Sequence, residues 1–115
     1  MVKNVKIGKV VLAFSLLKDA TLGEMSVNDK LNVINALGAI RKITTDFEVF
    51  KNDIAQKMTE NSEQERMAAL LKQANTDVEI SGYNSITMES LGQLIDANKK
   101  FTVDEMTVLQ ELLVE

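Results

Sequence analysis

The sequence contains no histidine, cysteine, tryptophan or proline. Without histidine, neither a serine–histidine nor a cysteine–histidine nucleophilic pair can be built. Without histidine and cysteine, the usual ligand sets for zinc, haem and iron–sulfur clusters are also missing. The absence of cysteine excludes disulfide bonds, which suits a reducing compartment such as the cytoplasm. We therefore expect a cytoplasmic protein that is not an enzyme, with no catalytic residues, no cofactor and no metal.

The composition is that of a folded chain. Apolar residues make up 45% and charged residues 26% of the 115 residues, close to the average of soluble globular proteins. This length fits a single domain spanning residues 1–115. The formal net charge is −4 and no run of lysine or arginine occurs, which argues against a nucleic-acid partner. No apolar run is long enough to span a membrane.

The first twenty residues allow three interpretations. Three lysines before residue 10 precede an apolar run at residues 10–17, an arrangement similar to the start of a secretion signal. Lys18 and Asp19 follow at once, and no cleavage site with small residues is present. We interpret residues 9–20 as a buried helix, with a strand or a removed signal as the alternatives.

The most informative segment is residues 27–58, where apolar side chains recur at intervals of three, four and seven residues. Side chains at these intervals meet on one face of a helix. A helix of about 32 residues is about 48 Å long, whereas a compact chain of this length has a diameter of about 35 Å. The helix must therefore bend near Gly38, make the molecule elongated, or be covered in part by another subunit.

We predict that this apolar stripe is an interaction face. A stripe three positions wide is also typical of a helix within a bundle, so packing inside the same chain is the alternative. The residues of the predicted face are Val33, Ile40, Ile43, Phe47, Phe50, Ile54 and Met58.

Four hydroxyl residues mark the starts of helices, because a serine or threonine side chain can accept a hydrogen bond from the first free backbone N–H groups. A glutamate three residues after Ser62 and after Thr102 predicts capping boxes. Gly23 suits a left-handed turn between the first two helices. The four predicted N-caps are Ser26, Ser62, Thr87 and Thr102.

These signals predict an all-α (mainly α) fold. We expect an irregular bundle of about five helices around the long amphipathic helix. A third helix over residues 63–74 is apolar at Met67, Leu70, Leu71 and Ala74. Two short helices joined by residues 96–100 should form a C-terminal helical hairpin.

Residues 76–85 form the one extended segment, in which Val78 and Ile80 could make a short strand. Three oxygen-bearing side chains at alternate positions are followed by a glycine, as at the start of an EF-hand calcium loop. The closing position, where a glutamate belongs, is Met88, and Glu89 comes one place late. A calcium-responsive module with a degenerate loop at 77–89 is therefore an alternative function, and an acidic connecting turn is the simpler interpretation. The four residues of the first half are Asp77, Glu79, Ser81 and Gly82.

Paired carboxylates leave a small enzyme that uses only carboxylates as a further alternative. Glu63 lies close to Glu65, and Asp104 is adjacent to Glu105. Both pairs fall in the first turn of a predicted helix, where acidic side chains stabilise the helix dipole. Their placement favours capping over catalysis.

Residues 43–50 and 101–110, with the sequences ITTDFEVF and FTVDEMTVLQ, resemble an uncharacterised group of small helical proteins found among prophage-like genes of gut anaerobes. The resemblance implies a virion-assembly or accessory context. It covers about a third of the chain, contains no chemical motif and transfers no site residues.

From the residues themselves we expect a non-enzymatic interaction or assembly protein. Its partner should be another protein or a second copy, most simply a homodimer with two-fold symmetry. No nucleic acid, membrane or cofactor is expected among its partners.

Overall fold

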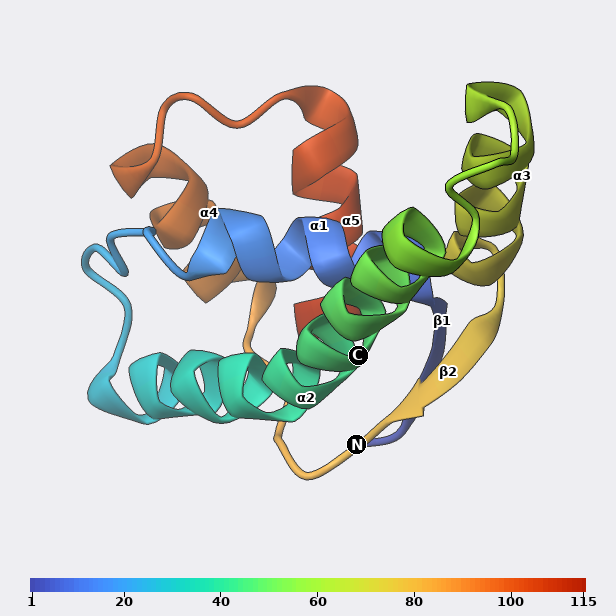
Figure 1. Cartoon of the computed structure of the whole chain (residues 1–115). Coiled ribbons are helices and arrows are strands. Elements are labelled where there is room, and N and C mark those ends of the chain that lie inside the picture. The colour runs from blue at the N-terminus through green and yellow to red at the C-terminus, as the bar shows by residue number, and fades with distance from the viewer.

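A computed structural model describes all 115 residues. It contains five helices and one two-stranded sheet (Figure 1). The mainly helical class is confirmed, and the sheet adds a β component that an all-α fold lacks. In chain order the elements are β1 (Lys3–Lys6), α1 (Ile7–Leu17), α2 (Val27–Lys57), α3 (Glu63–Ala74), β2 (Asp77–Ile80), α4 (Met88–Ala97) and α5 (Val103–Leu113).

The sheet joins the start of the chain to residues more than seventy positions away. β1 and β2 are antiparallel, with Lys3 opposite Ile80 and Lys6 opposite Asp77. Because side chains alternate across a strand, one face of this pair turns inward, and Val5 and Ile80 are buried there. The predicted short strand at 78–80 is confirmed, whereas its partner strand was not predicted.

Helix α1 begins two residues earlier than predicted and ends at Leu17 instead of residue 20. Its N-cap residue, Lys6, makes no side-chain capping bond. Instead, the N–H of Ile7 donates to the carbonyl of Thr76 at 3.0 Å, so the strand pair positions the helix start. Helix is thus the correct interpretation of this segment.

All four predicted N-caps are confirmed, because each hydroxyl accepts a hydrogen bond from the backbone N–H three residues later. At Thr102 the capping box is complete, since the Glu105 carboxylate accepts from the Thr102 N–H at 2.8 Å. At Ser62 the glutamate carboxylate accepts from the side chain of Asn61 and from the Ser62 hydroxyl. Gly23 has a φ of 72°, as predicted for a left-handed turn.

The core lies where α1 packs along α2 and against α5 (Figure 1). Each of the three helices contributes the buried side chains of one face, and α4 contributes a further pair. The buried residues of these helices include Val10, Ala13, Leu17, Val33, Ala36, Ile40, Leu91, Leu94, Leu109, Leu112 and Leu113.

The long helix is continuous through Gly38 and about 46 Å long for its 31 residues. Figure 1 shows its axis changing direction near the middle. There, the hydroxyl of Thr44 donates to the carbonyl of Ile40 and that of Thr45 to Arg41, both at 3.0 Å, and such bonds bend helices. The molecule is nevertheless elongated, with extents of 51 × 28 × 18 Å.

Candidate functional site

The second half of α2 and the whole of α3 form a projection, residues 45–74, which we call the helical arm. The last buried residue of α2 is Thr44, and α3 contains no buried residue. The cause is the length of α1, because its 11 residues extend only about 17 Å and cover the first half of α2. The apolar side chains of the helical arm are therefore covered by one another and, at the base of the arm, by α1 and β2.

Helix α3 folds back along the end of α2 and leaves a groove between the two helices. The groove has a volume of about 370 Å³. Its apolar lining comes from Ile54 and Ala55 of α2 and from Met67 and Leu70 of α3. Polar and charged side chains of both signs complete the lining: Lys51, Asn52, Glu63 and Arg66.

A second cavity, of about 200 Å³, lies at the base of the helical arm. Ile43 and Phe47 of α2 line it together with Ile7 and Val78 from α1 and β2. The helical arm thus joins the rest of the molecule through an imperfectly filled apolar contact.

The residues of the predicted interaction face fall into two environments. Val33 and Ile40 are buried in the core of the chain itself, and Ile43 is half-buried against that core. The remaining four belong to the helical arm and are half-buried there: Phe47, Phe50, Ile54 and Met58. The rings of Phe47 and Phe50 lie 6.4 Å apart between centroids.

Three apolar side chains of the helical arm lie outside the predicted face. They are more exposed than the residues of that face. Val49 is 58% exposed, Met67 is 50% exposed and Leu71 is 55% exposed. Met67 lines the groove and Leu71 stands one turn further along α3, so the two side chains form an apolar strip that starts at the groove. The sequence indicates this exposure on α3, because that helix has more apolar positions than the single face that packs against α2 can bury.

Arg66 holds the free end of the helical arm in place. Its guanidinium donates to the carbonyl of Asn61 at 2.7 Å and to that of Met58 at 3.2 Å. These bonds satisfy carbonyls at the end of α2 and in the following turn, where no helical partner exists. The connection between the two helices is therefore a defined turn.

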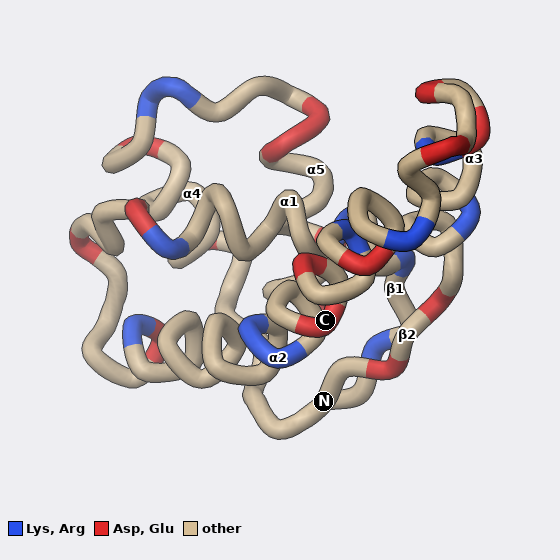
Figure 2. Tube along the Cα trace, in the orientation of Figure 1, with Lys and Arg blue, Asp and Glu red and all other residues tan.

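Charge is distributed unevenly along the helical arm. Figure 2 shows acidic residues at the end where α3 begins. Glu63 and Glu65 lie in the first turn of α3 and Lys72 lies in its last turn. Hydrogen bonds from Asn61 and Ser62 lower the pKa of Glu65. Helix α3 thus carries negative charge at its start and positive charge at its end.

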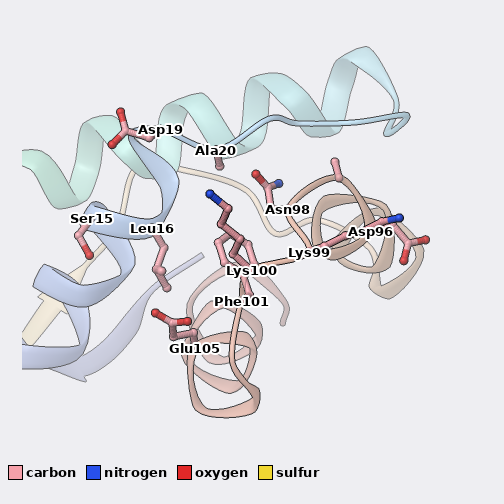
Figure 3. Close-up of a pocket in the computed structure, with 11 residues that line it drawn as sticks. Ser15, Leu16, Asp19, Ala20, Asp96, Asn98, Lys99, Lys100, Phe101 and Glu105 are labelled. Atoms are coloured by element: carbon pink, nitrogen blue, oxygen red, sulfur yellow. The ribbon is translucent and has the colours of Figure 1, made fainter.

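The largest hollow in the molecule lies between the end of α1 and the connection from α4 to α5, with a volume of about 600 Å³. Figure 3 shows Lys100 reaching across it toward the end of α1. Two of the other polar groups have structural partners: Asn98 exchanges hydrogen bonds with the backbone of Thr21, and Glu105 caps α5. This arrangement holds the connections between helices and brings no nucleophile together with a base.

The segment considered for calcium has a different geometry from an EF-hand loop. Asp77 and Glu79 lie in β2 and are exposed, and alternate positions of a strand are separated by about 6.6 Å. Gly82 has a φ of 91° in the turn that follows. No group of three or more acidic side chains is arranged to hold a metal ion. This geometry does not favour the calcium hypothesis.

No family model, curated protein or solved structure matches the chain. None of the helices combines the length and the apolar character needed to cross a membrane. The functional interpretation therefore depends on the geometry of the helical arm.

Proposed function

We propose that this protein is a non-enzymatic interaction and assembly protein that associates with a second copy of itself through the helical arm. The observation that carries the proposal is the apolar groove between α2 and α3, together with the exposed apolar strip of Met67, which lines it, and Leu71, one turn further along α3. Nothing in the chain covers this strip. Exposed apolar surface of this kind favours association.

The shape of the helical arm suits the binding of another helix. Two packed helices present a groove into which the side-chain ridge of a third helix fits, at interaxial distances of about 8–10 Å. Recognition of a helix in such a groove depends on apolar side chains spaced by three and four residues. Met67 and Leu71 have this spacing, so the surface that forms the groove also offers a ridge.

The presence of both a groove and an apolar ridge on one surface favours a homodimer. Each copy supplies one groove and one apolar ridge, and two-fold symmetry is the commonest way to close such a self-complementary surface. Two helical arms side by side would complete the helical bundle expected from the wide apolar stripe of α2. The cytoplasm suits a chain without cysteine, and a virion-assembly or accessory role is the context that the resemblance of residues 43–50 and 101–110 suggests.

Light scattering over a series of protein concentrations tests the proposal. We expect the wild-type chain to be a dimer at high micromolar concentration and Leu71→Asp to be a monomer with an unchanged far-ultraviolet circular dichroism spectrum. Val27→Asp is the matched control, because Val27 is 72% exposed on the first turn of α2, far from the helical arm. It should remain dimeric.

Leu71 is a better test position than Phe50 or Ile54. The latter two are half-buried between the helices, so a charge there would disturb the helical arm itself. A wild-type chain that stays monomeric at high micromolar concentration would contradict the proposal, as would a Leu71→Asp variant that dimerises as well as Val27→Asp.

A further inference from the structure

The base of the helical arm combines two fixed points with an unfilled cavity beside them. We infer that the helical arm is hinged at its base and rotates as a rigid body, closing on this cavity. The rotation belongs to the single chain and does not require that two copies associate.

The first fixed point lies in α2. Thr44 is the last residue of α2 that is buried, and its hydroxyl donates to the carbonyl of Ile40 at 3.0 Å. The next residue, Thr45, donates in the same way to Arg41. Hydroxyl bonds of this kind bend a helix and destabilise it slightly. The core therefore holds α2 up to residue 44, and the direction of the helix beyond that point depends on few contacts.

The second fixed point lies where α3 ends. The N–H of Ile7, at the start of α1, donates to the carbonyl of Thr76 at 3.0 Å. Gly8 lets α1 approach α3 closely, because a Cβ at Gly8 would lie 3.3 Å from both the side chain and the backbone oxygen of Ala74. The end of α3 is thus tied to the start of α1, whereas α3 itself has no buried residue.

The cavity of about 200 Å³ adjoins both fixed points. Ile43 and Phe47 line it from α2, Gln73 from the last turn of α3, and Ile7 and Val78 from the opposite side. Close packing normally keeps neighbouring elements in place, but this volume exceeds the share of about 30 Å³ that one water molecule occupies. Rotation toward α1 and β2 moves Phe47 into the cavity and gains van der Waals contacts that the open position lacks.

Contacts between α2 and α3 keep the helical arm in one piece as it rotates. The two helices pack against each other and share the groove lined by Ile54 and Leu70. At the far end, the guanidinium of Arg66 donates to the carbonyls of Met58 and Asn61. The two helices should therefore move together, with the change of direction confined to the base.

The length of the helical arm amplifies a small movement at its base. Phe47 lies three residues beyond Thr44, or about 4.5 Å along the helix, and Met58 lies fourteen residues beyond it, or about 21 Å. A shift of about 1 Å at Phe47 therefore moves the far end by about 5 Å. Such a rotation changes the direction in which the groove between α2 and α3 faces, relative to the core.

Distances between pairs of spin labels test the rotation, because the chain contains no cysteine that would compete with introduced ones. Gln64→Cys on α3 with Asp96→Cys on α4 measures the helical arm against the core, and Asn28→Cys with Asp96→Cys is the reference within the core. All three positions are exposed. Hinge motions take microseconds to milliseconds, and freezing traps their positions. The distances from the helical arm should spread about 5 Å more widely than the reference distances.

Filling the cavity should stop the rotation. Val78→Phe places a larger side chain in the cavity and should narrow the Gln64–Asp96 distances to the width of the reference pair. Val78→Ile adds one methylene and should narrow them less, and it serves as the second variant if the larger ring disturbs β2. Val49→Phe is the matched control, because Val49 is 58% exposed on the helical arm and lies outside the cavity. It should leave the distances widely spread.

A third pair of labels separates rotation from local unfolding. Glu48→Cys and Gln64→Cys both lie on the helical arm, so their distances should be as narrow as those of the reference pair. Widely spread distances within the helical arm would mean that it unravels and would overturn the hinge. Equal widths for the arm–core and core pairs would also overturn it, as would equal narrowing by Val78→Phe and Val49→Phe.

These outcomes are distinct from those of the proposed function. An excess of unlabelled protein keeps labelled chains apart, so the measured distances belong to single chains. A wild-type chain that stays monomeric would contradict the proposed self-association, whereas the hinge is supported or overturned by the distance distributions alone.

Discussion

The single tyrosine offers a sharp test of how the end of the chain is held. Tyr83 is 4% exposed, and its hydroxyl donates to the carbonyl of Leu112 at 2.8 Å. Leu112 lies in the last turn of α5, where carbonyls have no partner within the helix. Burial raises the pKa of Tyr83, so the hydroxyl stays protonated at neutral pH and can act as donor. We predict that Tyr83→Phe destabilises the fold.

The expected magnitude follows from what the substitution leaves behind. Phenylalanine keeps the ring and its packing, so no cavity forms. It removes the one donor to the carbonyl of Leu112, a residue with no exposed surface. A buried polar group left without its partner costs about 1–3 kcal/mol, a large part of a typical stability of about 5–15 kcal/mol. The melting temperature should fall by roughly 3–6 °C for each kcal/mol in a domain of this size.

Urea unfolding followed by far-ultraviolet circular dichroism measures the difference. The midpoint should fall with an unchanged slope, because the surface exposed on unfolding stays the same. Ser81→Ala is the control, since Ser81 is exposed and lies in the same connection. If Tyr83→Phe and Ser81→Ala had the same midpoint, the bond to α5 would contribute nothing and the reasoning would be wrong.

Three further predictions concern other parts of the chain. The hydrogen bond from Ser90 is the main cause of the lowered pKa of Asp29, so its stabilisation is present above the unfolded pKa of about 3.9 and is lost as the pH falls through the folded value. Asp29→Asn should therefore lower the unfolding midpoint near neutral pH, and this effect should disappear as the pH falls through the folded pKa of Asp29. Gly23→Ala should lower the free energy of unfolding by about 1–3 kcal/mol, because a Cβ at this left-handed position would lie 2.9 Å from a backbone oxygen of α4. Thermal unfolding measures this loss. In the same experiment, Gly92→Ala should stabilise the chain slightly, because a Cβ there would stand in open space within α4. Calorimetric titration with calcium should give no heat of binding from residues 77–89, and a saturable signal would revive the calcium hypothesis.

The helix starts could be predicted from the sequence because their causes are local. A hydroxyl side chain and a backbone N–H three residues away decide an N-cap, and the chain alone brings them together. The long helix was predictable for a similar reason, since its apolar period continues from residue 27 to residue 58 with no proline. These features need no knowledge of the rest of the fold.

The sheet and the exact start of α1 could not be predicted in the same way. Residues 3–6 form a strand because Val78 and Ile80 lie opposite them, and the bond that sets the start of α1 comes from Thr76. Both causes lie about seventy residues further along the chain. A short segment with one buried side chain, Val5, carries too little periodicity to reveal a strand by itself.

The candidate site was predicted in part. The apolar side chains of α2 do lie along one side of the helix, but the sequence does not show how far α1 extends along that side. The stripe therefore divides at Thr44 into a half that is buried at Val33 and Ile40 and a half that is open on the helical arm. Met67 and Leu71 were recognised as apolar but not as exposed, because that depends on how α3 folds back along α2.

This division gives the two halves of α2 different stabilities. The first half shares the buried core, so its amides should exchange with solvent only when the whole molecule unfolds. The helical arm has no buried side chain beyond Thr44, and regions with few buried contacts open locally at lower free energy. A dimer formed through α3 would stabilise the helical arm by mass action and leave local opening elsewhere unchanged. Hydrogen exchange should therefore slow in residues 45–74 as the protein concentration rises, while in a Leu71→Asp chain the exchange there should be fast and independent of concentration. Slowing that is spread evenly over the molecule would mean that the copies meet at another surface.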